Sequence, residues 1–163
     1  MSNGSKRNEM NGKGNIIMSP KGDYLSWMIL PFRRYADFKG RSCRKEYWMF
    51  QFIIWLSLGV YGILFSTILG LTGAGTVDSN FNPVIVIFII PLIAGILISV
   101  IPGIALTVRR FHDQGKSGWF ALLFMLLNAI PFIGWVFGII FIAFMMIDGT
   151  VGDNEYGPDP KQR

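Results

Sequence analysis

His112 and Asp113 are neighbours in the sequence, and a histidine oriented by a carboxylate can move protons in catalysis. Arg109 and Arg110 stand just before them, and arginine is well suited to binding phosphate. The segment therefore offers two chemistries, acid–base catalysis on a lipid headgroup and anion binding. A structural role competes with both, because Asp113 lies four residues after Arg109, the spacing of a salt bridge within a helix. We favour the structural role, since adjacent residues of a helix do not face each other.

A second group of charged residues lies between Phe38 and Trp48: Lys39, Arg41, Arg44, Lys45 and Glu46. Aromatic residues end this segment, as is typical of a membrane interface. The simplest interpretation is an interfacial anchor, and a specific site for lipid headgroups or a partner protein is the alternative. From the two segments we take seven candidate lipid- or partner-binding residues: Arg41, Arg44, Glu46, Arg109, Arg110, His112 and Asp113.

Other site chemistry finds little support in the sequence. Cys43 is the one cysteine and His112 the one histidine, which excludes an intramolecular disulfide and a multi-histidine metal site. The run Gly115-Lys116-Ser117 resembles the end of a phosphate-binding loop, but Arg110 stands where the earlier glycine is required. We therefore expect no cofactor and no metal.

The elements that must position these residues are hydrophobic helices. Hydrophobic residues make up 52% of the chain and charged residues 15%, whereas an ordinary soluble domain has about 25% charged residues. Three uncharged stretches, 48–71, 84–108 and 119–147, are each long enough to cross a bilayer, which needs about 20 helical residues. The sequence thus predicts an all-α membrane protein, a small bundle of three transmembrane helices.

The third stretch, 119–147, has a second interpretation. Asn128 and Pro131 interrupt it, and it is too short for two full crossings of about 20 residues each. Gly134 and Gly138 form a small-xxx-small pair that lets helices approach closely, although glycine is common in membrane helices. One kinked crossing is the simplest prediction, and it would separate the C-terminal tail from residues 109–113. A re-entrant element would instead bring the tail beside them as one composite site.

The flanking segments complete the predicted organisation. Residues 1–20 are polar and are predicted to be a disordered tail, residues 21–160 form a single multi-pass membrane domain, and 161–163 end the tail. Within that domain, residues 23–35 have an apolar side and are too short to cross. They predict an N-terminal interfacial helix, with a solvated lead-in as the alternative.

The distribution of lysine and arginine predicts the orientation in the membrane. Residues 1–47 hold ten of them, residues 72–83 none, residues 109–118 three and the tail after residue 147 two. Because positive residues stay on the cytoplasmic side, the N-terminus and the loop at 109–118 are predicted to be cytoplasmic. The net charge of +5 then reflects orientation and attraction to anionic lipid rather than nucleic-acid binding.

Four motifs resemble those of the YhaH/YhaI-like bacterial inner-membrane proteins, a family with a domain of unknown function (DUF805). They are Phe38-x-Gly-Arg-x-x-Arg-x-Glu-Tyr-Trp48, Arg109-Arg-Phe-His-Asp-x-Gly-x-Ser-Gly-Trp119, Pro131-Phe-Ile-Gly134 and Gly152-Asp-Asn-Glu-Tyr-Gly-Pro-Asp-Pro160. The resemblance runs from about Tyr24 to Pro160 and implies a small multi-pass bundle in the bacterial cytoplasmic membrane. It implies no activity, substrate or cofactor.

Three functions follow as hypotheses. The leading one is a non-enzymatic membrane protein that binds anionic lipid or a partner, either a second copy or another membrane protein, through its cytoplasmic rim. A small transporter or channel subunit is an alternative, disfavoured because no ionisable residue lies within a predicted span. The third is a lipid-headgroup enzyme that uses His112 and Asp113.

Overall fold

The computed structural model of the chain describes residues 9–10, 16–17, 24–72 and 83–161, and nearly all the regular structure in these ranges is helical. The elements in chain order are β1 (Glu9–Met10), β2 (Ile16–Ile17), α1 (Tyr24–Arg33), α2 (Arg44–Thr72), α3 (Pro83–Asp113), α4 (Trp119–Asn128) and α5 (Gly134–Met146). The two short strands pair antiparallel within the predicted N-terminal tail, whose other residues lie outside the described ranges. The predicted all-α class is confirmed.

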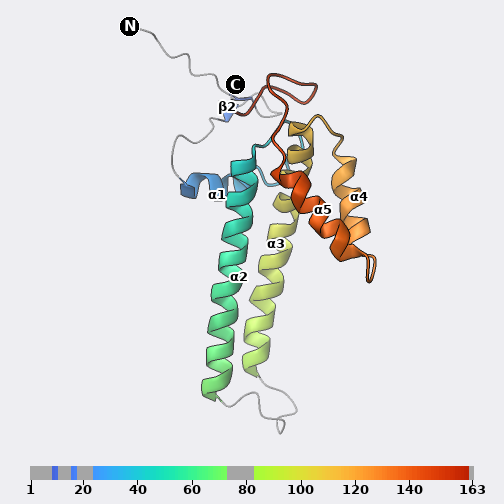
Figure 1. Cartoon of the computed structure of the whole chain (residues 1–163). Helices are drawn as coiled ribbons and strands as arrows, with labels where there is room; N and C mark the ends of the chain where they lie inside the picture. The colour runs from blue at the N-terminus through green and yellow to red at the C-terminus, as the bar shows by residue number, and fades with distance from the viewer. Residues whose placement is uncertain (1–8, 11–15, 18–23, 73–82, 162–163) are drawn as a thin grey trace.

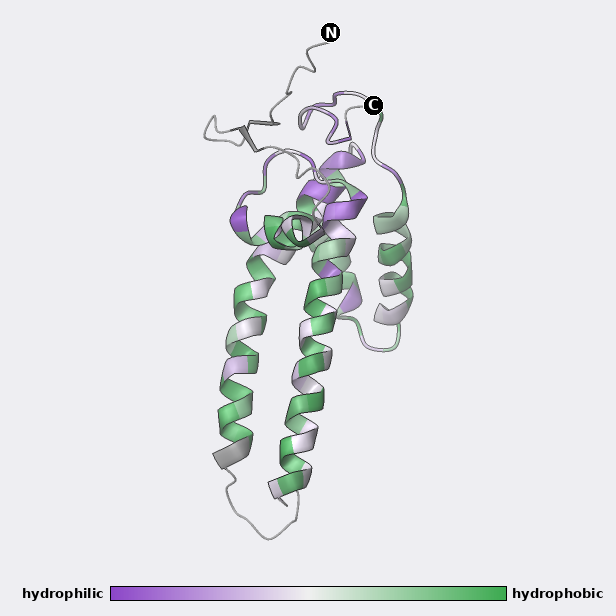
Figure 2. Cartoon of the chain, turned by 90° about the vertical axis from the view of Figure 1, so that its left-hand side faces the viewer, coloured by the Kyte–Doolittle hydropathy of each residue, from purple (hydrophilic) through white to green (hydrophobic). Residues whose placement is uncertain are grey.

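Two long helices, α2 and α3, lie side by side and give the molecule its length (Figure 1). They have 29 and 31 residues, and both contain windows apolar enough to cross a membrane. At about 1.5 Å per residue each exceeds the roughly 30 Å of a bilayer core. Both helices begin or end in polar residues at the same end of the molecule, and apolar residues fill most of their remaining length (Figure 2). The first two predicted spans are therefore found as helices of sufficient length.

The predicted third crossing is not one helix, and that interpretation is wrong. The stretch 119–147 forms two antiparallel helices, α4 with 10 residues and α5 with 13, which pack as a hairpin. Each is too short for a crossing of about 20 residues. The chain turns at Pro131, which has no N–H group to continue a helix, and at Phe132, whose φ of 65° is left-handed. The hairpin has the geometry of the re-entrant alternative.

Helix α1 packs against α2 and α3 near their polar ends and lies across them in Figure 1. Trp27 and Leu30 are buried with Cys43, whereas Tyr24 and Leu25 are each 61% exposed. A short helix with one buried and one exposed apolar side suits the predicted interfacial position.

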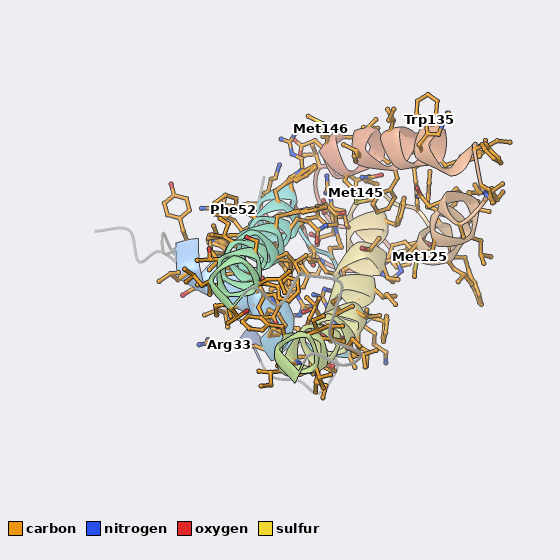
Figure 3. The ribbon with its side chains drawn as sticks, turned by 90° about the horizontal axis from the view of Figure 1, so that it is seen from below. Arg33, Phe52, Met125, Trp135, Met145 and Met146 are labelled. Carbon is orange, nitrogen blue, oxygen red and sulfur yellow. The ribbon has the colours of Figure 1, made fainter. Side chains whose placement is uncertain are left out.

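The best-packed part of the molecule lies where all the helices meet. Phe111 is fully buried there, stacks on Phe124 with ring centroids 5.9 Å apart, and packs with Phe50 and Met145. Seen along α2 and α3, Met145 faces these helices and Trp135 points away from them (Figure 3). The parts of α2 and α3 that extend beyond the other helices, away from the polar end, expose large apolar side chains, as expected of a surface that faces lipid rather than water.

Candidate functional site

Three arginines are buried together at the polar end of the bundle. Arg109 and Arg110 have no exposed surface and Arg41 has 4%. Taking a guanidinium out of water costs several kcal/mol unless carboxylates and hydrogen-bond acceptors replace the water. We call these three arginines, their partners Asp113 and Glu46, and the segments that they contact, including the C-terminal tail, the polar cap.

Asp113 is the central acceptor of the polar cap. Its Oδ1 accepts a hydrogen bond from Nε of Arg41 at 3.0 Å, and its Oδ2 accepts one from Nη1 of Arg110. The three side chains are each at most 2% exposed. One carboxylate therefore neutralises two buried cations that come from different parts of the chain.

Arg41 also holds the C-terminal tail. Its two terminal nitrogens donate to the carbonyl oxygens of Gly152 and Thr150, both at 2.6 Å, and to that of Gly157 at 3.3 Å. Five N–H donors in a fixed fork suit one arginine to several carbonyl acceptors at once. The tail, predicted to lie outside by a simple third crossing, is thus bound to the cap.

Arg109 joins the loop before α2 to the end of α3. Its Nε donates to Oγ of Ser42 at 2.9 Å and its Nη2 to Oε1 of Glu46 at 3.3 Å. Its backbone carbonyl accepts from the N–H of Ser42 at 3.2 Å, and its Nη1 reaches the carbonyl of Asp37. Glu46 is 3% exposed, so this pair too lies out of water.

Arg110 reaches the end of the hairpin. Besides Asp113, its guanidinium contacts the carbonyl oxygens of Met145 at 3.5 Å and of Ile147. These are carbonyls at the C-terminus of α5, which an arginine both hydrogen-bonds and stabilises through the helix dipole. The cap thereby fixes where the hairpin ends.

The His112 side chain contacts Tyr156 and Gly40 rather than Asp113, the partner that acid–base catalysis would require. Its ring stacks on Tyr156 at 4.0 Å between centroids and 3° between planes, and its Nδ1 donates to the carbonyl of Gly40 at 3.2 Å. Within the described residues, no hydrogen bond joins His112 to Asp113. The side chains therefore do not form an acid–base pair.

A close approach between the tail and α3 requires glycine at position 149. A Cβ atom there would lie 2.0 Å from Oδ2 of Asp113, closer than any real contact. The next residue, Thr150, donates its N–H to the Asp113 carbonyl at 2.8 Å. The composite site of the re-entrant alternative, with the tail beside residues 109–113, is thus found in the structure.

Arg44 differs from the other candidate residues because it remains accessible. Its side chain is 41% exposed and pairs with Asp148, itself 40% exposed, at 2.9 Å.

The residues on either side of Arg44 have different surroundings. Cys43 is buried, and this burial raises the pKa of its thiol, so it is a poor nucleophile at neutral pH. Lys45 lies over the rings of Tyr24 and Trp27, 4.9 and 5.2 Å from their centroids.

Of the seven candidates, the structure places five in the polar cap as two neighbouring groups of ion pairs: Arg41 and Arg110 with Asp113, and Arg109 with Glu46. Sequence reasoning missed several of its members: Arg34, Asp37, Ser42, Gly149, Thr150 and Asp159. The polar, turn-forming composition of the tail was the available signal for the last three. Among the described residues, no group of three or more His, Cys, Asp or Glu side chains could hold a metal ion.

Comparison with known proteins supplies the family. The profile of a family described as "Protein of unknown function (DUF805)" matches residues 35–158, which include the ion pairs of Arg41, Arg109 and Arg110 and all helices from α2 to α5. The chain belongs to the DUF805 family. No solved structure matches it significantly.

Relatives of this DUF805 protein are named as inner-membrane proteins. It is 39% identical to "Inner membrane protein YhaH" of Escherichia coli K12, covering 84% of this chain and 98% of the relative. It is 34% identical to "Inner membrane protein YhaI" of the same organism, over 84% of this chain and 97% of the relative. The "Uncharacterized protein YiiR" is 32% identical over 76% of this chain. These names and the two long apolar helices support a location in the cytoplasmic membrane.

Proposed function

We propose that this DUF805 protein is a non-enzymatic, multi-pass protein of the bacterial cytoplasmic membrane that binds anionic lipid at its cytoplasmic rim. The observation that supports it is the position of Lys45 over the aromatic rings of Tyr24 and Trp27 on α1. An amphipathic helix with aromatic and basic residues lies in the lipid headgroup region, where each nearby cation contributes about 1 kcal/mol of attraction to anionic lipid.

The polar cap changes which residues carry this binding. Arg41, Arg109 and Arg110 are buried and already paired, so they act within the protein rather than on a lipid phosphate. Arg33 and Lys45 are accessible cations on or against α1, and the side chain of Arg33 points away from the helices (Figure 3). We therefore assign headgroup binding to α1 and its neighbours.

The two other hypotheses gain nothing from the structure. A headgroup enzyme needs His112 to be oriented by Asp113, and those side chains face different partners. A transporter or channel usually needs an ionisable residue at depth in the membrane. In α2 between Tyr47 and Thr72, and in α3 between Ile85 and Val108, the sequence contains no Asp, Glu, Lys, Arg or His.

The proposed orientation predicts which engineered cysteines react from which side. In a Cys43→Ser background, we expect Ser117→Cys and Val151→Cys to react with an impermeant maleimide from the cytoplasmic side. Both positions are exposed and belong to the polar end, with Val151 71% exposed. Thr72→Cys, at the far end of α2, should react from the periplasmic side. Opposite labelling of Ser117→Cys and Val151→Cys would contradict the hairpin, and labelling of both from outside would contradict the orientation.

Lipid preference tests the proposed binding. In vesicles of mixed anionic and neutral phospholipid, native mass spectrometry of the wild-type protein should show retained anionic lipid in preference to neutral lipid. The variant Arg33→Glu/Lys45→Glu should reduce this preference by about tenfold or more, since two cations at about 1 kcal/mol each are lost. Lys39→Glu is the matched control, because Lys39 is exposed but lies in the loop before α2. Equal retention of both lipids by the wild-type protein would rule out the proposal.

A further inference from the structure

We infer that the cleft between α2, α3 and the α4–α5 hairpin holds one acyl chain of a membrane phospholipid whose headgroup lies at Arg44. This deepens the proposed lipid binding by giving the chain of a lipid its own site within the membrane part of the protein. The inference rests on that proposal for the headgroup, while the site for the acyl chain stands on its own geometry.

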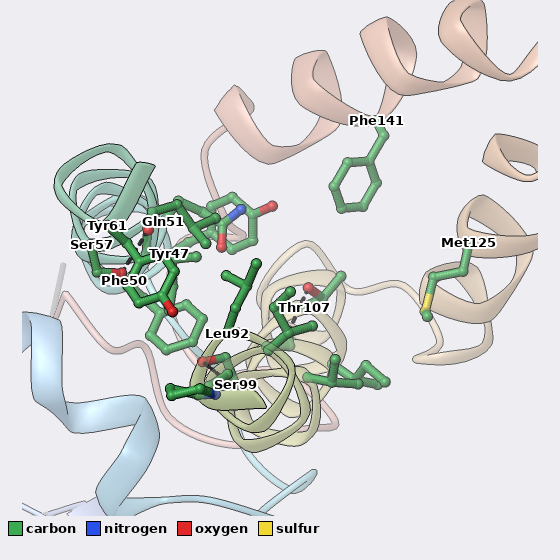
Figure 4. Close-up of a pocket in the computed structure, with 18 residues that line it drawn as sticks. Tyr47, Phe50, Gln51, Ser57, Tyr61, Leu92, Ser99, Thr107, Met125 and Phe141 are labelled. Atoms are coloured by element: carbon green, nitrogen blue, oxygen red, sulfur yellow. Dashed lines mark hydrogen bonds between the residues drawn. The ribbon is translucent and has the colours of Figure 1, made fainter. Parts of the chain in front are cut away.

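The cleft is large and lies beside the two long helices. Its volume is about 720 Å³, within the range of roughly 300–1,000 Å³ that ligand sites occupy. In Figure 4, α2 and α3 form two of its walls, while Phe141 of α5 and Met125 of α4 project towards it from the hairpin. It extends along α2 from Tyr47 to Tyr61, about 20 Å at 1.5 Å per residue. An extended hydrocarbon chain fits a space of this shape.

The lining of the cleft is mostly apolar and offers few free hydrogen-bond donors to a polar ligand. Most lining residues are aliphatic or aromatic. The hydroxyl groups of Ser57, Ser99 and Thr107 each donate to a carbonyl of their own helix at 2.8 Å. The hydroxyl of Tyr61 donates across the helix pair to the Phe88 carbonyl. A ligand in the cleft therefore gains mainly from apolar contact, as an acyl chain would.

Charge at one end of the cleft indicates how the lipid is oriented. Arg44 lies three and seven residues before Tyr47 and Gln51, so it shares the face of α2 that lines the cleft. It is at the polar end and its side chain is 41% exposed. A guanidinium has five N–H donors and can bind a phosphate while it keeps its pair with Asp148. Gln51, two turns deeper, places an amide that can donate to the ester carbonyl of the same lipid.

A helix from a second copy is the other occupant to be tested. The cleft has apolar side chains along most of its length and an exposed arginine at one end, a combination that suits the acyl chain and the phosphate of one lipid. Insertion of a second copy is an outcome that the experiment must detect.

Photo-crosslinking tests the site in the intact protein. The wild-type chain is reconstituted in vesicles with a phospholipid that carries a diazirine within one acyl chain, irradiated and mapped by peptide mass spectrometry. We expect the label to concentrate on cleft residues of α2 and α3 such as Ile54, Leu58 and Ile96. Gly95→Trp should reduce that label by about tenfold or more, the effect of losing about 1.4 kcal/mol of binding free energy.

Two glycines provide a matched pair of variants. Gly95 lines the cleft and Gly59 does not, and a Cβ atom at either position meets nothing within 4 Å. Tryptophan at Gly95, on α3, therefore fills the cleft without displacing backbone. Gly59→Trp adds the same bulk on α2, outside the cleft, and should leave cleft labelling unchanged. Equal labelling around α2, unaffected by Gly95→Trp, would mean ordinary surrounding lipid and would overturn the inference. Disulfide formation between two Gly95→Cys copies would overturn it in favour of a second chain.

Binding of the headgroup at Arg44 is tested by a separate measurement. Anionic and neutral forms of the photolipid are compared on wild-type protein and on Arg44→Gln, which should lower labelling by the anionic form alone. If both forms label the cleft equally in the wild type, Arg44 does not bind the headgroup. Failure of the rim proposal would appear as lost lipid preference with intact cleft labelling. Failure of the cleft inference would appear as intact preference with no cleft label.

Discussion

Replacing Asp113 with asparagine is expected to destabilise the protein by about 3–5 kcal/mol, the usual cost of removing one partner of a buried ion pair. The substitution keeps the shape of the side chain and removes its charge. Arg41 and Arg110, which are both buried, would then lose the carboxylate that neutralises them. Because Arg41 also holds the carbonyls of Thr150 and Gly152, the tail should be released together with the cap.

Unfolding in detergent micelles by heat or denaturant measures this effect, and limited proteolysis of the tail measures its release. Asp148→Asn is the matched control. Asp148 pairs with Arg44 and with Lys161, and all three side chains are partly exposed, so each of these pairs should contribute no more than about 1 kcal/mol. Equal stability of the Asp113→Asn and Asp148→Asn variants would show that the polar cap is not held by its central carboxylate.

Hydrophobicity alone was sufficient to predict α2 and α3. Uncharged runs of more than 20 residues have few stable forms other than a helix in lipid, where the backbone must satisfy its own hydrogen bonds. The predicted spans began and ended within the observed helices, which continue beyond 48–71 and 84–108 into charged residues. The extensions were missed because each predicted span ends where charged residues begin, whereas Glu46, Arg109, Arg110 and Asp113 are buried in ion pairs and lie within the helices.

The pairing inside the polar cap was not predictable from spacing. The sequence allowed a helical pair between Arg109 and Asp113, four residues apart, but Arg109 pairs with Glu46 instead. Asp113 pairs with Arg110, three residues away, and with Arg41 from before α2. Local spacing shows which pairs can form within a helix, whereas the choice among several arginines depends on how α2, α3 and the tail pack.

The α4–α5 hairpin was partly predictable from the sequence. The average hydrophobicity of 119–147 does not distinguish one long helix from two short ones, since both consist of apolar residues. The breaks at Asn128 and Pro131 gave the local signal, and the re-entrant alternative followed from them. The return of the tail to residues 109–113 depended on that alternative, so the composite site could be stated in advance only conditionally.

Replacing Gly134 with alanine is expected to destabilise the hairpin by about 3 kcal/mol, at the upper end of the usual cost of overpacking. A Cβ atom on Gly134 would lie 2.2 Å from the backbone oxygen of Asn128 and 2.9 Å from its carbonyl carbon. These atoms are backbone and cannot rotate away as a side chain can. Helix α4 would have to separate from α5, which would break the turn bond from the Gly134 N–H to the Ile130 carbonyl at 2.8 Å.

Gly138→Ala is the control for this prediction, because it adds the same methyl group one turn further along α5. There the nearest atom is the side-chain oxygen of Asn128 at 3.0 Å, which can move by a few tenths of an ångström. We expect unfolding in detergent to show a large loss of stability for Gly134→Ala and a change within about 1 kcal/mol for Gly138→Ala, whose methyl group a small side-chain movement accommodates. If the stretch 119–147 instead crossed the membrane as one helix, position 134 would not meet Asn128 backbone atoms. Both substitutions would then have similarly small effects, since alanine suits a helix interior better than glycine does.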